Sequence, residues 1–281
     1  MQMMKIAGLM TGLTVLLVLA GSWFGGQNGA VIMFVVAAVM NLGADWFSDR
    51  AVLRMYRARV VGPEEAPELY AMVERLARRA DLPVPTVAIS AQSQPNAFAT
   101  GRSPEKGVVC FTQGILQALS REELEGVAAH ELAHIKHRHM LVSAIAATMA
   151  GAITMLAVVA RWGAIFAGGR DGDRNPLGLL VMSLVAPLAA GIVRMAISRQ
   201  NEFQADRTGA EIAGTPTGLA SALRRMDSYA DQIAMDVNPA GASLAIVNPL
   251  RGRRAAGLGR LFLTHPPIEE RIERLRTMGG R

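Results

Sequence analysis

The stretch Glu125-Gly126-Val127-Ala128-Ala129-His130-Glu131-Leu132-Ala133-His134-Ile135 is the feature around which the whole sequence can be interpreted. It holds the pattern H-E-x-x-H among residues that favour a helix. On a helix, His130 and His134 lie one turn apart on one face, so their ring nitrogens can converge on a single ion. Glu131 stands where its carboxylate can reach a water molecule on that ion without being a ligand. The stretch therefore predicts a metal-binding helix.

A helix start lies just upstream, where Ser120 is followed by Glu123 at the spacing of a capping box. Acidic residues in the first turn favour the same start. The alternative is that two histidines fell four residues apart by accident. Because the chain has five histidines, a chance H-E-x-x-H is expected in roughly one such sequence in a hundred. We therefore favour the metal site.

The composition indicates a membrane protein, since 51% of the 281 residues are hydrophobic and the mean hydropathy is +0.26. The net charge of +6 could suggest nucleic acid. However, the Lys and Arg residues flank apolar runs and form no patch with interleaved aromatics, so we expect a lipid bilayer and no nucleic acid as a partner. The single Cys110 excludes an internal disulfide, and its apolar neighbours indicate a small core residue.

A first membrane hairpin is predicted near the N-terminus, because residues 6–44 carry no charge. Glycines at 25, 26 and 29 divide this run into two segments of about 18 residues, each long enough to span a bilayer. A cleaved signal peptide is disfavoured because a second apolar run follows at once. Lys5 precedes the hairpin and several arginines follow it, so the positive-inside rule places both ends in the cytoplasm.

A second hairpin is predicted from two further uncharged runs, residues 141–160 and 175–193, which a short polar loop separates. The alternative is a pair of buried helices in a large soluble core. Outside the hairpins, the patterns predict a helix over 63–80 and short strands over 84–89, 97–101 and 107–111. Pro95 and the glycines favour an exposed sheet edge. Helices are also expected over about 217–235 and 268–278.

A third metal ligand has few candidates. His137 shares the helical face of the other two histidines but lies a further turn along, so Glu202 is the better candidate. Asp206, one turn after Glu202, could accept a hydrogen bond from a ligand histidine and fix its orientation. The alternative is that Glu202 and Asp206 form a solvated acidic helix face.

Three further motifs accompany His130-Glu131-Leu132-Ala133-His134. They are Asn201-Glu202-x-x-Ala205-Asp206, Pro95-Asn96-Ala97-Phe98-Ala99-Thr100-Gly101 and Thr264-His265-Pro266-Pro267. With the two hairpins, the motifs resemble those of the HtpX membrane zinc metalloproteases, relatives of the CAAX prenyl proteases. The resemblance covers nearly the whole chain. It implies a zinc endopeptidase of the bacterial inner membrane that faces the cytoplasm and takes part in membrane-protein quality control.

Carried over by position, the resemblance implies that His130, His134 and Glu202 bind one Zn²⁺ and that Glu131 is the catalytic glutamate. Its substrates would be peptide segments of membrane proteins. The histidine-rich His137-Arg138-His139 departs from many relatives, and neither histidine is assigned a role. No oligomeric state is specified.

The expected fold is α+β and mostly helical, an integral membrane protein with two transmembrane helical hairpins. A cytoplasmic zincin-type catalytic domain carries a small edge sheet. The predicted segments are a first transmembrane hairpin (1–48), a first catalytic part with the H-E-x-x-H helix (49–139), a second hairpin (140–194) and a second catalytic part with the third ligand (195–281).

Two residues are predicted to assist catalysis. His265 lies outside the metal helix at a helix start, and it could donate to the oxyanion that develops beside the metal. The alternative for His265 is a capping or packing role. Asn96 and its edge strand could pair with an extended substrate by strand addition.

A competing function is a non-catalytic membrane protein that binds or transports metal through a histidine-rich site. A transporter would be expected to hold ionisable residues inside its spans. The predicted spans have none, and a carrier has no need of Glu131.

Overall fold

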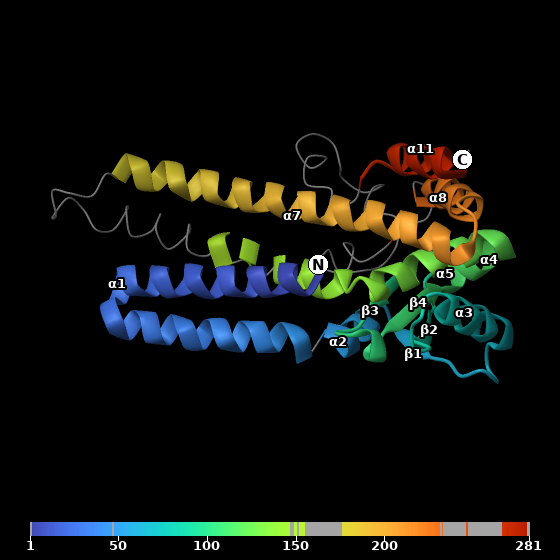
Figure 1. The fold of residues 1–281 in the computed structure, drawn as a ribbon, viewed down its shortest axis with the longest axis horizontal. Helices are drawn as coiled ribbons and strands as arrows, with labels where there is room; N and C mark the ends of the chain where they lie inside the picture. The colour runs from blue at the N-terminus through green and yellow to red at the C-terminus, as the bar shows by residue number, and fades with distance from the viewer. Residues whose placement is uncertain are drawn as a thin grey trace. The chain divides into compact units, whose positions relative to one another are not determined.

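The computed structural model describes residues 2–46, 48–146, 149–150, 152–154, 176–230, 232, 246 and 266–279. This described part of the protein is mostly helical with one small sheet, and the chain divides into two compact units (Figure 1). Unit 1 comprises Met1–Trp46 and Leu141–Ile197, and unit 2 comprises Phe47–Met140 and Ser198–Arg281. The boundaries between the units fall after residues 46, 140 and 197. The boundaries between the predicted segments fall after residues 48, 139 and 194.

Unit 1 contains helix α1, Gln2–Trp46, which is broken at Gly26. Gly26 has φ 59° and ψ −145°, values that glycine adopts readily because it has no Cβ. The helix reverses direction there and forms two antiparallel arms (Figure 1). Gly21 and Gly29 face each other across the arms so closely that neither has room for a Cβ. Small residues beside the turn therefore allow the two backbones to approach.

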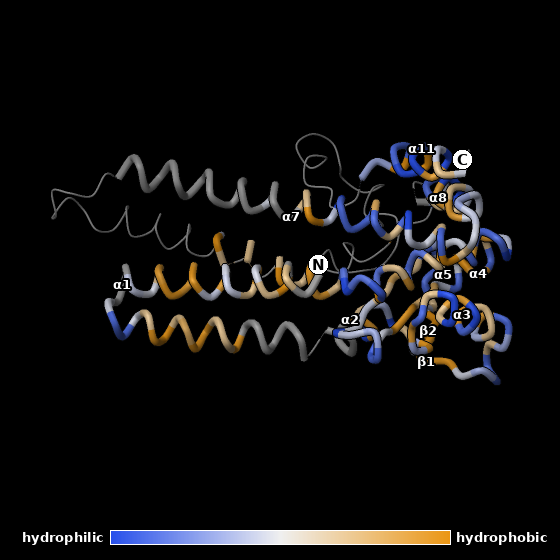
Figure 2. Tube along the Cα trace, in the orientation of Figure 1, coloured by the Kyte–Doolittle hydropathy of each residue, from blue (hydrophilic) through white to orange (hydrophobic). Residues whose placement is uncertain are grey.

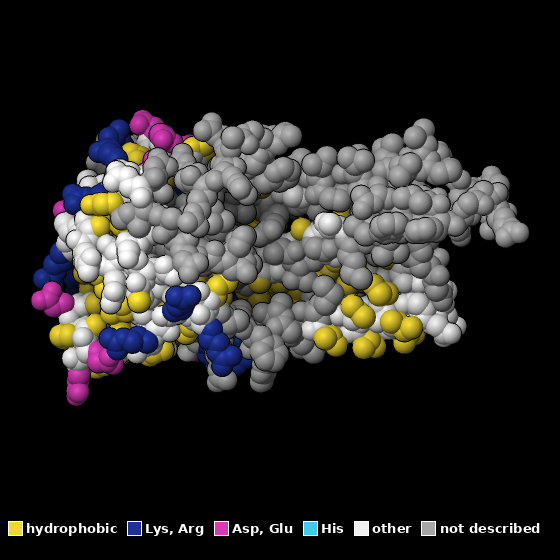
Figure 3. Space-filling model, turned by 180° about the vertical axis from the view of Figure 1, so that it is seen from behind, with side chains coloured by type: hydrophobic (Ala, Val, Ile, Leu, Met, Phe, Trp, Pro, Cys, Tyr) yellow, Lys and Arg dark blue, Asp and Glu magenta, His cyan; other side chains and the backbone are white. Residues whose placement is uncertain are grey.

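Apolar side chains fill the space between the arms and also cover their outer surface. Leu13, Leu17 and Ala37 are buried together, whereas Val31 and Phe34 are 59% and 56% exposed. Hydropathy along the arms and the apolar side chains on the surface of α1 are visible in Figures 2 and 3. Among the described residues, no helix combines the length and the apolar character needed to cross a membrane. Residues 155–175 of the predicted second hairpin lie outside the described residues.

Unit 2 contains a four-stranded sheet in the order β1-β2-β4-β3. The strands are β1 (Ala58–Val60), β2 (Thr86–Ser90), β3 (Ala97–Thr100) and β4 (Val108–Thr112). Strands β2 and β4 are parallel, and the other two pairs are antiparallel. The predicted edge position of β3 agrees with the strand order, but the prediction of an exposed edge is wrong, because all four residues of β3 are buried. Strand β1 was not predicted, because three residues are too few to show an alternating pattern.

The described helices of unit 2 are α2 (Ser48–Met55), α3 (Pro67–Arg79), the 3-10 helix η1 (Pro104–Lys106), α4 (Gln113–Ala118), α5 (Arg121–Lys136), the C-terminal part of α7 (Pro176–Ala213), α8 (Thr217–Ala230) and α11 (Ile268–Gly279). Helices α2, α4 and α5 contact the sheet. The predicted capping box at the start of α5 is confirmed, since Ser120 Oγ accepts from Glu123 N and Glu123 accepts from Ser120 N.

Helix α5 is the centre of the unit 2 core. It packs on α8, α3 and β3, and its buried residues include Val127, Leu132 and Ile135. A Cβ added at Gly126 would collide with the backbone of α8 at Leu219. Because α5 packs against several other elements, its backbone is held in place. The side chains that it directs into the site therefore start from fixed Cα positions.

Candidate metal centre

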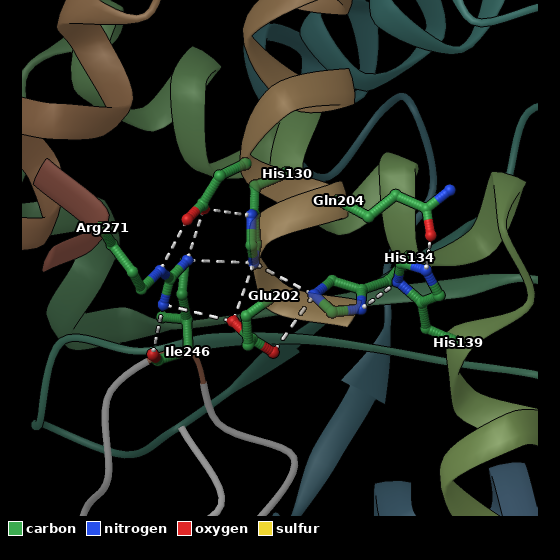
Figure 4. Close-up of polar contacts among 8 residues, drawn as sticks. His130, His134, His139, Glu202, Gln204, Ile246 and Arg271 are labelled. Carbon is green, nitrogen blue, oxygen red and sulfur yellow. Dashed lines mark hydrogen bonds and ion pairs between the residues drawn. The ribbon is translucent and has the colours of Figure 1, made fainter. Parts of the chain in front are cut away.

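Helices α5 and α7 bring the predicted ligands together. His130 and His134 lie one turn apart on α5, and Glu202 projects from α7 (Figure 4). His130 is fully buried, and Glu202 is 5% exposed. The approach depends on Gly209 of α7, where an added Cβ would lie 2.9 Å from both N and Cα of His130. The missing side chain therefore permits α7 to reach the backbone of α5 at the site itself.

The candidate ligand atoms face one another at short distances. His130 Nε2 lies 3.0 Å from His134 Nε2, and each of these nitrogens lies 3.6 Å from an oxygen of Glu202. One ligand atom from each residue falls within 4.8 Å of the other two. Metal–ligand bonds of 2.0–2.1 Å in a tetrahedron place the ligands about 3.3 Å apart. Two imidazoles and one carboxylate at these separations fit zinc, which such donor sets hold in catalytic sites.

Asp206 lies behind His130, with its Oδ1 3.1 Å from His130 Nδ1. Burial alone would raise the pKa of Asp206, but the Arg271 guanidinium and the contact with His130 hold that pKa below its usual range. The alternative of a solvated acidic face for Glu202 and Asp206 is wrong, since both are buried.

Arg271 of α11 is a member of the site that the sequence analysis missed. It is fully buried and donates two hydrogen bonds to Asp206, at 2.9 and 2.7 Å. Its Nη1 also lies 3.2 Å from Glu202 Oε2. Although burial would lower the pKa of Arg271, the two carboxylates raise it. A signal was present, because Arg271 interrupts the apolar face formed by Ile268, Ile272 and Leu275.

Glu131 is 2% exposed and lies beside the edge strand, where it accepts a hydrogen bond from the Ala99 backbone. Burial raises the pKa of Glu131 to about 7, against the opposing attraction of His130, and the Glu202 carboxylate adds to the rise. A carboxylate with a pKa near neutrality is suited to take and return a proton at neutral pH.

His137 does not join the ligand cluster. Its Nε2 lies 2.9 Å from Thr208 Oγ1, and its Nδ1 lies 3.2 Å from Gln204 Nε2. His139 contacts the other side of His134, with 3.2 Å between the two Nδ1 atoms. Burial lowers the pKa of His139 to about 4, so the ring is neutral at pH 7.

Of the two residues predicted to assist catalysis, Asn96 is among the described residues and His265 is not. Asn96 is buried at the start of β3, where its Oδ1 accepts from Ala97 N and its N donates to Thr112 Oγ1. The Ala97 carbonyl, on the side of β3 that faces away from β4, accepts from Ile246 N. His265 lies outside the described residues.

The fold and the site together define a metallopeptidase: two histidines and a glutamate converge, and a buried glutamate lies beside them next to a strand edge. Residues 63–279 match the family model for peptidase family M48, so the chain belongs to this family and is a metalloendopeptidase.

Relatives from several bacteria match nearly the whole chain. A protease HtpX homolog from Desulfatibacillum aliphaticivorans is 50% identical over 275 residues, covering 96% of this chain and 88% of the relative. Another from Gemmatimonas aurantiaca is 51% identical, with 100% of each chain covered. A third, from Salinibacter ruber, is 52% identical and covers 100% of this chain and 99% of the relative.

The fold also resembles a solved structure. The crystal structure of S. mikatae Ste24p superposes with a TM-score of 0.54 at 20% sequence identity, over 98% of this chain. The match spans 64% of the length of Ste24p. At this identity the likeness concerns the fold alone.

Proposed function

We propose that the chain is a zinc endopeptidase of the cell inner membrane that cleaves misfolded or damaged membrane proteins at the cytoplasmic face. The observation that carries the zinc assignment is the convergence of His130 Nε2, His134 Nε2 and the Glu202 carboxylate. These three groups are the proposed ligands of one ion. Asp206 and Arg271 hold the ligands in place through the contacts described above.

Glu131 is the proposed general base and acid. His130, His134 and Glu202 would hold the zinc ion, which when bound would supply a Lewis acid to polarise the scissile carbonyl and would lower the pKa of a water molecule to about 7. The Glu131 carboxylate takes a proton from the attacking water and then passes it to the leaving amine. Its raised pKa and its position beside β3 both support this role.

The substrate is proposed to bind as an extended strand along the edge of β3 that is not paired with β4. Main-chain hydrogen bonds to an edge strand recognise a peptide without regard to most of its sequence. Asn96 precedes this strand and is proposed to contact the substrate. His265 is proposed to donate to the developing oxyanion.

The membrane location is supported by the surface of α1. The outward side chains of α1 are large and apolar, with Ile32, Val35 and Val39 all more than half exposed. Exposed apolar surface of this kind is favourable in lipid and costly in water. We propose that both hairpins enter the bilayer and that unit 2 faces the cytoplasm, since Lys5, Arg54 and Arg57 flank the first hairpin.

Cleavage of an unfolded membrane-protein substrate by the purified full-length protein tests the proposal. Hydrolysis should stop with a chelator and return with Zn²⁺. Glu202→Ala should lose most of its zinc because it removes a ligand, whereas Asp206→Ala should weaken binding by about 10–100-fold. Chelator-resistant hydrolysis, or normal zinc affinity in Glu202→Ala, would contradict the assignment.

A further inference from the structure

A line of hydrogen bonds runs from the metal centre on the side of His134 that faces away from the ligand atoms (Figure 4). His134 Nδ1 lies 3.2 Å from His139 Nδ1, and His139 Nε2 lies 3.3 Å from Gln204 Oε1. Gln204 Nε2 lies 3.2 Å from His137 Nδ1, and His137 Nε2 lies 2.9 Å from Thr208 Oγ1. The contacts join five side chains in series.

His139 reaches His134 because the helix stops between them. On a continuous helix, a residue five positions later is rotated by about 140° and faces elsewhere. Here α5 ends at Lys136, and Arg138 has φ 53°, a left-handed conformation that non-glycine residues rarely adopt. The turn directs His139 back onto His134, where it is 1% exposed. Such strained backbone persists where the surrounding structure requires it.

The donor in each contact follows from the first one. If His134 offers Nε2 to an ion, its proton is on Nδ1 and is donated to His139 Nδ1. The His139 proton must then be on Nε2, which donates to Gln204 Oε1. Gln204 donates from Nε2 to His137 Nδ1, so His137 carries its proton on Nε2 and donates to Thr208. All the hydrogen bonds then point away from the metal centre without a conflict between two donors or two acceptors.

We propose that His139 is a positioning residue that orients His134 and fixes its proton on Nδ1, and that Gln204, His137 and Thr208 hold His139 in turn. The inference rests on the proposed function, because it takes His134 as a metal ligand. Asp206 holds the other ligand histidine through His130 Nδ1. The two imidazoles are therefore oriented by different chemistry, a carboxylate for one and a neutral chain for the other.

The charges around the site explain why a neutral acceptor suits His134. Glu131, Glu202 and Asp206 are already buried close together, and they share one buried guanidinium, Arg271. A further carboxylate behind His134 would add another negative charge that must lose its hydration. A neutral imidazole accepts the same hydrogen bond without that cost.

Two substitutions of His139 separate the links. In His139→Asn, the amide oxygen can take the place of the ring Nδ1 and accept from His134, while the link to Gln204 is lost. In His139→Gln, the longer side chain can reach Gln204 but leaves His134 without this acceptor. Zinc affinity of the purified full-length protein is measured by competition with a chromophoric chelator. We expect near-normal affinity in His139→Asn and a loss of about 10–100-fold in His139→Gln.

The outer links should matter progressively less. Gln204→Met should weaken zinc binding less than His139→Gln, and Thr208→Val should weaken it least. Gln200→Met is a matched control, because Gln200 lies one turn earlier on α7 and is exposed. Thermal unfolding of each metal-free variant shows whether a loss of affinity is merely a loss of folded protein.

The outcomes separate this inference from the proposed function. Wild-type protein that binds no zinc, or Glu202→Ala that binds it normally, contradicts the proposed function. Loss of zinc in Glu202→Ala with normal affinity in both His139→Gln and Gln204→Met overturns only the role of His139. Equal losses in His139→Asn and His139→Gln, matched by equal losses of thermal stability in the metal-free protein, would also overturn it, since a packing role predicts that pattern.

Discussion

At the scale of single residues, Glu131 combines a catalytic position with a stability cost. Its pKa is raised from 4.5 to about 7 in the folded protein. Between these values the folded state holds a proton that the unfolded state has lost. Folding stability of the metal-free protein therefore falls as pH rises from 4.5 to 7, by about 3 kcal/mol at 1.4 kcal/mol per pH unit.

Glu131→Gln should remove this pH dependence and also abolish hydrolysis while zinc stays bound. The amide is neutral at every pH and cannot take a proton from water. Thermal unfolding of the metal-free proteins from pH 4.5 to 8 should show the variant gaining stability relative to wild type as pH rises. A stability difference between the variant and the wild type that stays constant across this range would contradict the raised pKa of Glu131. Wild-type turnover in the variant would contradict the role of Glu131 as general base.

Arg271 should be required for stability as well as for metal binding. Arg271→Met leaves Asp206 and Glu202 without the guanidinium, and breaking such a buried pair costs about 3–5 kcal/mol. Denaturant unfolding measures the loss. Arg276→Met on the same helix is the control, because its side chain is 58% exposed and its ion pair with Glu273 is long, 4.0 Å; we expect a change below about 1 kcal/mol. Similar effects of the two substitutions would contradict the role of Arg271.

Sequence spacing was sufficient to predict the proposed ligands but not their surroundings. His130 and His134 are close in sequence, so helix periodicity alone places them together. Glu202 and Asp206 were found because a carboxylate pair in an apolar, basic chain needs an explanation. Arg271 was missed because its partners lie 65 and 69 positions away, a relation that only tertiary structure reveals.

At the scale of elements, the site depends on the close approach of α5 and α7. Gly209→Ala should separate these helices, because the new methyl group would lie 2.9 Å from backbone atoms that cannot rotate away. Overpacking of this kind costs about 1–3 kcal/mol, and the shift should also weaken zinc binding. Thermal unfolding and zinc competition measure the two effects.

Gly8→Ala is the matched control for this substitution. Gly8 lies in a helix and has no atom within 4 Å of an added Cβ. Alanine should stabilise this position slightly, because it favours a helix more than glycine does. Unchanged zinc affinity in Gly209→Ala would show that the helix contact does not set the ligand geometry.

The elements with strong local signals were predicted well. The capping box at Ser120 and the edge position of β3 both agree with the structure. The end of α5 was harder, since Lys136-His137-Arg138-His139 contains no glycine or proline to mark a break. The left-handed Arg138 reflects tertiary contacts of His139, which no local pattern encodes.

At the scale of the whole molecule, the two segments of unit 1, which contain the apolar runs, alternate along the sequence with the two segments of unit 2. Hydropathy and charge predict an alternation of this kind, because uncharged runs of about 20 residues are rare in soluble chains. The family match begins at residue 63 and therefore leaves out the first apolar run. The proposed topology consequently requires its own test.

Single cysteines should report the topology in intact cells. The positive-inside rule predicts that the tip of the first hairpin lies outside and that unit 2 lies in the cytoplasm. Gln27 is the better tip position, because Gly26 has a positive φ that a cysteine would strain. Both Gln27 and Glu64, a position in unit 2, are exposed. Cys110 is fully buried, and burial raises its pKa to about 12, so the native thiol reacts poorly. Cys110→Ser removes this thiol altogether and gives the background for the single cysteines.

A membrane-impermeant thiol reagent should label Gln27→Cys before lysis and Glu64→Cys only after it. Two spans that begin and end on the cytoplasmic side allow no other pattern, because the arginines after α1 resist transfer across the membrane. Asp171→Cys, outside the described residues, should behave like Gln27→Cys if the second hairpin also spans. Labelling of Glu64→Cys in intact cells would show that the orientation in the membrane is the opposite of the proposed one. Protection of Asp171→Cys until lysis, with Gln27→Cys labelled, would leave the first hairpin as the sole membrane anchor and would favour buried helices for the second.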